Sequence, residues 1–255
     1  MSEEGMAARL IVALDVPTRK DAKRVVHTLD GVVEFFKVGL ELFTAEGPAL
    51  IEELTSEGRE VFLDLKLHDI PNTVAGAVRS ATRLGVRLLT LHTLGGSEMM
   101  RSAVGAGAEE ADRLGVNPVD LLGVTVLTSQ RGGTFIGDRD LGEAVLTLAT
   151  EARDSGLPGV VASVGECRAI KKTCGARFLV ATPGIRPVGA ASEDQKRVAT
   201  PGGAVEAGSN FVVVGRPVLK ADDPAGAARS ILEEMQAFGP PTESDGCAGD
   251  GRSGR

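Results

Sequence analysis

The sequence predicts a single-domain (β/α)8 TIM barrel, and three observations support this fold class. Apolar, strand-like runs alternate with helical stretches along most of the chain, which is typical of parallel sheets built from repeated β-α units. Eight such runs can be counted, and the 255 residues of the chain match the length that a barrel of eight units commonly fills as one domain. The runs begin near Leu10, Val33, Val61, Leu88, Leu121, Val160, Phe178 and Phe211.

An open, doubly wound sheet is the alternative fold. No G-x-G-x-x-G follows the first apolar run, so the dinucleotide-binding version of that fold lacks its main support. We expect the barrel to span residues 8–238. The remaining residues, 239–255, are rich in Gly, Pro, Ser, Asp and Arg and are expected to form a disordered tail that folding does not need.

Composition indicates a soluble protein that acts on a small molecule. The formal net charge of −7 argues against a nucleic-acid-binding surface, which is usually basic. The apolar run from Leu10 to Leu14 is too short for a membrane span or a signal peptide. Cys167, Cys174 and Cys247 lack the paired spacing of a zinc site and are interpreted as thiols of a reducing cytoplasm. We therefore expect a cytoplasmic protein with no nucleic-acid or membrane partner.

The first two runs each place a charge near their ends. Asp15 follows the first run, where an Asp can also serve simply as a helix cap. Lys37 stands near the end of the second run, where a lone Lys is usually solvated. Both residues would lie at the carboxyl end of a barrel strand, the side on which such barrels place their active sites.

The third run carries the most informative stretch, from Val61 to Thr73. Asp64 and Lys66 are two residues apart, so on an extended strand their side chains point to the same face. This spacing fits a catalytic pair at a barrel mouth, although a surface ion pair has the same pattern. Pro71 then suits the first turn of the next helix.

Polar side chains near the fourth and fifth runs have less specific meanings. His92 ends the fourth run and His68 follows the third; both are interpreted as packing or orienting residues rather than proton carriers. Thr128, after the fifth run, can bind a planar ligand or cap the next helix. The three histidines form no metal-binding pattern, so no metal is expected.

The seventh and eighth runs predict an anion site. Loops after these strands hold phosphate in many barrels, through glycine N-H groups, helix N-termini and a guanidinium. Gly215 and Arg216 directly follow the eighth run and fit this geometry. Arg186 follows the seventh run, and the polar stretch from there through Gln195 is long enough to be a lid.

Several strings together resemble the orotidine 5'-phosphate decarboxylase family. They are D-L-K-L-H-D-I-P-N-T, which contains the D-x-K-x-x-D signature, then T-P-G-I-R-P, an Asp-Gln pair and G-R-P, in order. The resemblance covers about residues 10–238 and implies decarboxylation of orotidine 5'-monophosphate to uridine 5'-monophosphate and CO2. It also implies a Lys/Asp charge network that works without a cofactor.

The resemblance assigns roles to individual residues. Lys66 would stabilise and protonate the carbanion at C6. Asp64 would hold Lys66 and Lys37 in place, and Lys37 would neutralise and position Asp64. Asp69 and Thr73 would reach into the site of a second subunit, which implies a homodimer with shared active sites. The implied substrate-binding residues are Asp15, Lys37, Thr73, Thr128, Arg186, Gln195, Gly215 and Arg216.

Two other functions remain open at this point. A magnesium-dependent sugar-phosphate decarboxylase or aldolase of the same superfamily shares D-x-K-x-x-D, although the D-I-P-N-T string and the long Gln195 loop argue against it. A non-catalytic barrel that binds a phosphate ligand is the other. The presence of Lys37, Asp64, Lys66 and Asp69 together disfavours that alternative.

Overall fold

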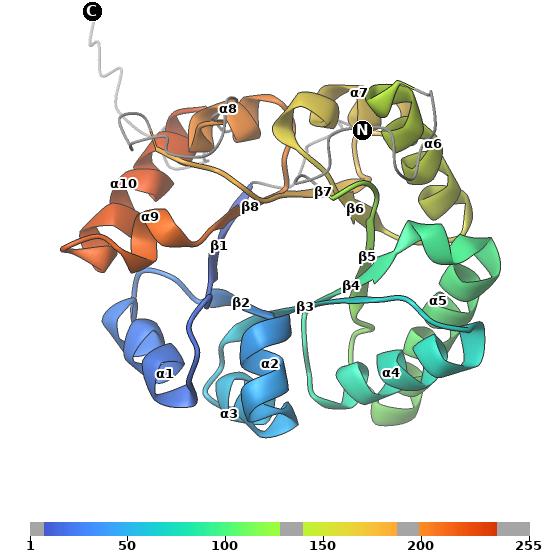
Figure 1. The fold of residues 1–255 in the computed structure, drawn as a ribbon, viewed down its shortest axis with the longest axis horizontal. Helices are drawn as coiled ribbons and strands as arrows, with labels where there is room; N and C mark the ends of the chain where they lie inside the picture. Colours follow the sequence, from blue (N-terminus) through green and yellow to red (C-terminus); the bar gives the residue numbers. More distant parts are fainter. Residues whose placement is uncertain (1–7, 128–139, 188–198, 239–255) are drawn as a thin grey trace, which may run out of the picture.

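A closed barrel of parallel strands organises the protein (Figure 1). The computed structural model describes residues 8–127, 140–187 and 199–238. Within them the strands follow chain order around the ring, and pairing of the last strand with the first closes it. The strands are β1 (Arg9–Ala13), β2 (Phe35–Gly39), β3 (Glu60–Leu67), β4 (Leu88–His92), β5 (Asp120–Val124), β6 (Gly159–Val161), β7 (Leu179–Thr182) and β8 (Phe211–Val214).

Helices surround the strand ring in Figure 1 and cover its outer face. The described helices are α1 (Arg19–Thr28), α2 (Leu40–Glu46), α3 (Pro48–Ser56), α4 (Pro71–Arg83), the 3-10 turn η1 (Thr93–Gly95), α5 (Gly96–Leu114), α6 (Leu141–Asp154), α7 (Val164–Cys174), α8 (Pro201–Glu206), α9 (Arg216–Leu219) and α10 (Pro224–Ala237). Among these described helices, none combines the length and apolar character needed to cross a membrane.

The predicted barrel is confirmed, and each strand begins within two residues of its expected start. The largest difference is at β2, which begins at Phe35 because Val33, although buried, lies before the hydrogen-bonded pairing with β3. Strand β3 continues beyond its apolar start as far as Leu67. The expected tail, residues 239–255, lies outside the described residues.

Two layers of apolar side chains hold the barrel together. Alternation along the strands sends one set of side chains inward and the other outward. On β1, Ile11 and Ala13 belong to the inner layer, whereas Leu10 and Val12 pack against the helices. Phe35 and Phe211 meet edge to face inside the barrel, with ring centres 5.9 Å apart. The barrel interior is therefore a packed core, and a ligand site has to lie above it.

Local sequence signals explain where several helices begin. Pro71 takes the first position of α4, where its missing N-H costs nothing and its fixed φ suits the helix. Ser163 and Glu166 form a capping box at the start of α7. The Asp140 carboxylate accepts hydrogen bonds from the first backbone N-H groups of α6. These caps fix the directions in which helices leave the strand ends.

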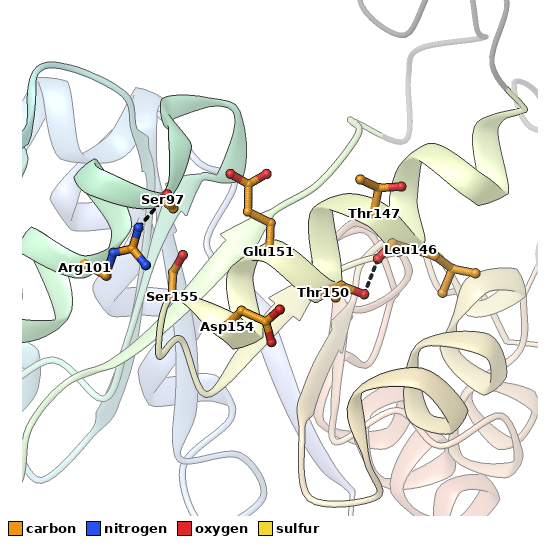
Figure 2. A pocket seen from close by; sticks show the side chains of 8 residues that line it. All are labelled: Ser97, Arg101, Leu146, Thr147, Thr150, Glu151, Asp154 and Ser155. Atoms are coloured by element: carbon orange, nitrogen blue, oxygen red, sulfur yellow. Dashed lines mark hydrogen bonds between the residues drawn. The ribbon is translucent and has the colours of Figure 1, made fainter.

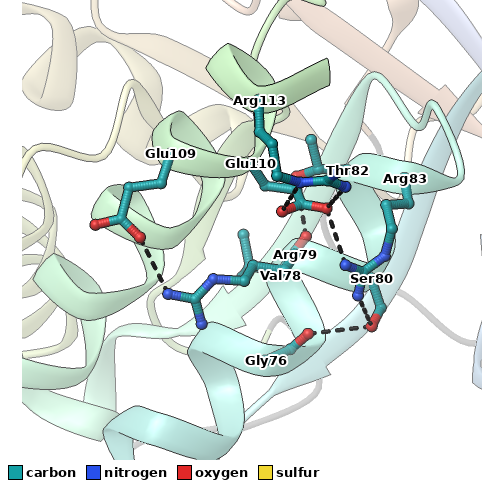
Figure 3. A network of polar contacts seen from close by, with 9 residues as sticks. All are labelled: Gly76, Val78, Arg79, Ser80, Thr82, Arg83, Glu109, Glu110 and Arg113. Carbon is teal, nitrogen blue, oxygen red and sulfur yellow. Dashed lines mark hydrogen bonds and ion pairs between the residues drawn. The ribbon is translucent and has the colours of Figure 1, made fainter.

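A network of arginines and glutamates ties α4 to α5 (Figure 3). Glu110 of α5 accepts hydrogen bonds from Arg83 of α4 at 2.9 Å and from Arg113 at 2.7 Å, and its side chain is only 7% exposed. The hydrogen bond from Arg113, assisted by the charges of both arginines, lowers the pKa of Glu110 from 4.5 to about 2. Because α4 follows β3 and α5 follows β4, this network helps to fix the two strands relative to each other.

Candidate active site

The inward-facing side chains change from apolar to polar toward the carboxyl ends of the strands. On β2 the buried Phe35 is followed two residues later by Lys37, and on β3 Phe62 is followed by Asp64. Residues two apart on a strand share a face, so these polar groups stand directly above the apolar core. The same change runs from Ala13 to Asp15 after β1 and from Leu88 to Thr90 and His92 on β4.

Asp64 and Lys66 form the central pair of this polar layer. The Lys66 Nζ lies 2.8 Å from both carboxylate oxygens of Asp64. The Asp64 side chain is 14% exposed and that of Lys66 is 30% exposed, so the pair is largely shielded from water but still accessible. The prediction that the two side chains share one side is confirmed. The interpretation as an ordinary surface ion pair does not fit this burial.

Regular strand alternation explains the pairing only in part, because β3 is irregular at Lys66. Lys66 has φ of +51° and is the one residue other than glycine with positive φ among the described residues. The left-handed conformation costs roughly 1–2 kcal/mol for a residue with a side chain. Strand pairing also shifts here: Leu63 and Leu67 of β3 lie opposite Leu89 and Leu91 of β4. This bulge redirects the Lys66 side chain back toward Asp64.

Thr90 of β4 lies opposite the bulge and was not identified from the sequence. Its hydroxyl oxygen accepts the backbone N-H of Lys66 at 2.8 Å, and its hydroxyl donates to Oδ1 of Asp64 at 2.9 Å. The side chain is fully buried. A signal was present, because a Thr two residues before His92 is a polar residue on the inward face of an apolar strand.

Lys37 extends the pair into a row of alternating charges. Its Nζ lies 3.7 Å from Oδ2 of Asp64 and 3.2 Å from Oδ1 of Asp15, and its side chain is 13% exposed. Small residues make room for this row. A Cβ added to Gly39 would lie 3.1 Å from the Lys37 ammonium, and one added to Gly215 would lie 3.1 Å from the Asp15 carboxylate. Asp15, Lys37, Asp64 and Lys66 are thus brought together as expected.

The two histidines near the mouth pack against each other. The rings of His68 and His92 are 5.5 Å apart, and His68 is exposed whereas His92 is half-buried. Burial, followed by the nearby charges of His68 and Lys66, lowers the pKa of His92 below 6.5. A neutral ring at pH 7 fits the predicted packing role better than that of a proton donor.

Of the other residues expected to bind the substrate, some follow β7 and β8 and some lie outside the described residues. Gly215 directly follows β8 and packs beside Asp15, while the side chain of Arg216, the first residue of α9, is exposed. Arg186 lies beyond the end of β7, and its backbone N-H donates to the carbonyl of Ala199 at 3.0 Å. Thr128 and Gln195 lie outside the described residues.

Asp69 and Thr73 lie beyond the end of β3, in the loop and in the first turn of α4. Both are exposed, and the Asp69 carboxylate accepts the backbone N-H of Ile70 at 2.7 Å. Within the described part of the chain, no ion pair joins Asp69 to Lys66 or Lys37. The single subunit therefore does not bring Asp69 into the row of charges.

The described residues present no arrangement of three or more His, Cys, Asp or Glu side chains suited to a metal ion. The row at the mouth instead alternates carboxylates with ammonium groups. Such a row can bind a polar ligand above the core, stabilise negative charge that develops near Lys66, and donate a proton from its ammonium.

A groove of about 600 Å³ lies elsewhere, between α5 and α6 on the outside of the barrel (Figure 2). Arg101 and Ser97 form one wall, and Glu151 and Asp154 contribute to the other. None of the charged residues at the barrel mouth lines this groove. We therefore take the polar layer at the mouth, not this groove, as the candidate active site.

Comparison with known proteins identifies the family of this chain. A family model described as Orotidine 5'-phosphate decarboxylase / HUMPS family matches residues 8–231. A relative from Nitratidesulfovibrio vulgaris (strain DP4), named Orotidine 5'-phosphate decarboxylase, is 51% identical over 232 residues, which cover 90% of this chain and 98% of the relative. A relative of the same name from Carboxydothermus hydrogenoformans is 49% identical over 234 residues, which cover 91% of this chain and 97% of the relative.

A solved structure supports the same assignment. The crystal structure of Orotidine 5'-phosphate decarboxylase from Lactobacillus acidophilus superposes with a TM-score of 0.80 at 38% identity, covering 89% of this chain and 99% of the other. The likeness therefore includes both the sequence and the barrel, over most of the chain. The chain belongs to the Orotidine 5'-phosphate decarboxylase / HUMPS family.

Proposed function

We propose that this protein decarboxylates orotidine 5'-monophosphate to uridine 5'-monophosphate and CO2, a step of pyrimidine biosynthesis. The observation that carries the proposal is the row of Asp15, Lys37, Asp64 and Lys66 at the barrel mouth. The curated relatives named for this activity align over about nine-tenths of the chain. The enzyme acts in the cytoplasm, where the free thiols of Cys167 and Cys174 fit a reducing environment.

Lys66 performs the chemical step in this proposal. The bond between C6 and the carboxylate breaks, its electron pair stays on C6, and CO2 leaves. The ammonium of Lys66 stabilises the negative charge developing at C6 and then transfers a proton to it, which gives uridine 5'-monophosphate. The neutral amine regains its proton from solvent. No step needs a cofactor, because the charges are supplied by the protein.

Asp64 acts mainly by holding the two lysines. In this proposal the Asp64 carboxylate lies beside the departing carboxylate of the substrate. Two like charges about 4 Å apart repel by roughly 4 kcal/mol at an effective dielectric constant near 20. Full relief of that repulsion when CO2 leaves would contribute about three powers of ten in rate, which is a small part of a large barrier. The contacts of Asp64 with Lys66 at 2.8 Å and with Lys37 at 3.7 Å support the positioning role.

The other site residues bind the parts of the substrate that do not react. Asp15, next to Lys37, binds the ribose hydroxyls. Arg216 and the backbone of Gly215 bind the phosphate beyond β8, and a guanidinium is well suited to phosphate oxygens. Arg186 and Gln195 complete the phosphate side, and Thr128 binds the pyrimidine.

The active form is a two-fold homodimer in which Asp69 and Thr73 enter the neighbouring subunit's site. Their exposure supports this arrangement, as does the lack of an ion pair between Asp69 and Lys66 among the described residues. Leu40, Ile70 and Leu94 are 55%, 67% and 46% exposed and follow the adjacent strands β2, β3 and β4. Exposed apolar side chains gathered beside an incomplete site suit a subunit interface.

Mixed dimers test the shared site. Lys66→Ala and Asp69→Ala subunits, each nearly inactive alone, are mixed in equal amounts and allowed to exchange. About half of the dimers become mixed, and each contains one native site, so about a quarter of all sites regain activity. Activity that stays at the parental level after verified exchange would show that Asp69 serves its own barrel.

The reaction itself is tested by following the absorbance of orotidine 5'-monophosphate in the presence of a chelator. Full turnover supports the proposal. Turnover of a sugar phosphate that requires added magnesium would favour the magnesium-dependent alternative. Tight binding of a phosphate ligand with no turnover of either substrate would favour a non-catalytic binding barrel.

A further inference from the structure

Thr90 connects two parts of the site that lie on β3. Its single hydroxyl group accepts the Lys66 backbone N-H and donates to the Asp64 carboxylate, at 2.8 and 2.9 Å. We propose that Thr90 is a positioning residue for the decarboxylation, which keeps the Lys66 ammonium aimed at the reacting carbon. This inference rests on the proposed function, because it assigns Lys66 the chemical step.

The local backbone explains why a hydroxyl is needed at this position. Lys66 is held at φ of +51°, and the pairing of β3 with β4 is shifted between Leu63 and Leu67. At the bulge the backbone N-H of Lys66 donates to a side-chain oxygen of the neighbouring strand, that of Thr90. A group that both accepts and donates satisfies the N-H and the carboxylate together.

Other buried threonines in the described residues do not have this pair of partners. The hydroxyl of Thr82 donates to the carbonyl of Val78, and that of Thr93 donates to the carbonyl of Val124, each at 2.9 Å. Those contacts are with backbone carbonyls alone. Thr90 instead contacts the main chain of one proposed catalytic residue and the side chain of another.

Loss of the hydroxyl would therefore disturb Lys66 at two points. The Lys66 N-H would be left without its acceptor, and Asp64 Oδ1 would keep the Lys66 ammonium as its donor but lose Thr90. A reacting group displaced by about 1 Å can lower the rate by about 100-fold. Binding of the ribose and phosphate, which lie at other strand ends, should change little.

The experiment compares Thr90→Val, which keeps the shape but removes the hydroxyl, with Thr90→Ser, which keeps the hydroxyl. Thr82→Val is the matched control, because Thr82 is also buried and its hydroxyl contacts only backbone. For each variant, kcat for orotidine 5'-monophosphate, the Kd for uridine 5'-monophosphate and Tm are measured. Should Thr90→Val fail to fold, the comparison of Thr90→Ser with Thr90→Ala isolates the hydroxyl at equal loss of the methyl group.

We expect Thr90→Val to lower kcat by about 10- to 100-fold with less than about a threefold change in Kd. Thr90→Ser should stay within about threefold of wild type in kcat, and Thr82→Val should change Tm without changing kcat. Equal loss in the Ser and Val variants, or a kcat of Thr90→Val equal to wild type, would overturn the proposal.

A crystal structure of Thr90→Val gives a readout that needs no turnover. If Lys66 leaves its positive φ, or its ammonium moves away from the Asp64 oxygens, the positioning role is supported even where wild-type protein does not consume the substrate. A wild-type protein that does not consume orotidine 5'-monophosphate would refute the proposed function but not the role of Thr90. An unchanged Lys66 conformation in Thr90→Val would refute the role of Thr90.

Discussion

Replacement of Lys37 by methionine tests the row of charges at the barrel mouth. Methionine keeps most of the length of the side chain but removes the ammonium that lies between Asp15 and Asp64. After the change, Asp64 retains Lys66 as its only cationic partner among the described residues, and Asp15 loses its partner. Both stability and turnover should fall.

The expected loss of stability follows from burial. Each contact of Lys37, at 3.2 and 3.7 Å, corresponds to about 5 kcal/mol of attraction at a dielectric constant near 20, most of which desolvation offsets. Removing one partner of a buried ion pair lowers the free energy of unfolding by about 3–5 kcal/mol. For an exposed ion pair the loss is about 1 kcal/mol or less. Lys37 and Asp64 are 13% and 14% exposed, but Asp15 is 55% exposed. We expect the free energy of unfolding to fall by about 2–3 kcal/mol.

Lys23→Met is the matched control. Lys23 also contacts two carboxylates, those of Glu53 and Glu57, but on the outer surface, with 32% of its side chain exposed. Its loss should cost about 1 kcal/mol or less and leave turnover unchanged. Urea unfolding and the orotidine 5'-monophosphate assay are run on both variants. Equal unfolding free energies for the two variants, together with full turnover by Lys37→Met, would refute the reasoning.

Three further predictions concern the phosphate, the α4–α5 network and His92. Arg216→Ala should weaken binding of uridine 5'-monophosphate about 10- to 100-fold and also lower kcat, whereas an equal loss for the nucleoside without phosphate would mean that Arg216 is misassigned. Arginine contacts lower the pKa of Glu110 from 4.5 to about 2, so its charged form stabilises the fold above pH 4.5 and this contribution is lost as pH falls toward 2. The stability difference between wild type and Glu110→Gln, measured in urea, should therefore be larger at about pH 7 than at about pH 3, and a difference independent of pH would contradict this. Because burial lowers the pKa of His92 below 6.5, its ring is neutral at pH 7 and above, and His92→Gln should leave the shape of the kcat profile unchanged between about pH 7 and 8. A lost ionisation in the variant would assign His92 a proton-transfer role.

The barrel could be predicted from sequence because its signals are local. Buried parallel strands are short apolar runs, and each β-α unit repeats the same pattern. The start of β2 and the end of β3 differ from the expected positions, because the limits of a buried apolar run do not coincide with the limits of strand pairing. Val33 is buried before β2 begins, whereas β3 continues through the charged residues Asp64 and Lys66.

The site was predictable where its residues lie on one strand or match a family string. Asp64 and Lys66 were identified in this way, and their contact is confirmed. The left-handed backbone of Lys66 was not predictable, because it depends on a shift in pairing between β3 and β4. Thr90 was missed because its importance arises from contacts with a neighbouring strand. The one signal in the sequence was a polar residue on the inward face of an apolar strand.

The most direct test of the central claim is the effect of Lys66→Ala, measured as turnover and as affinity for uridine 5'-monophosphate in the same metal-free preparation. If Lys66 acts on the transition state, orotidine 5'-monophosphate turnover is lost while calorimetry shows nearly the wild-type Kd for the product. Normal turnover by Lys66→Ala, with the product bound as tightly as in wild type, would contradict the assignment of the chemical step to Lys66.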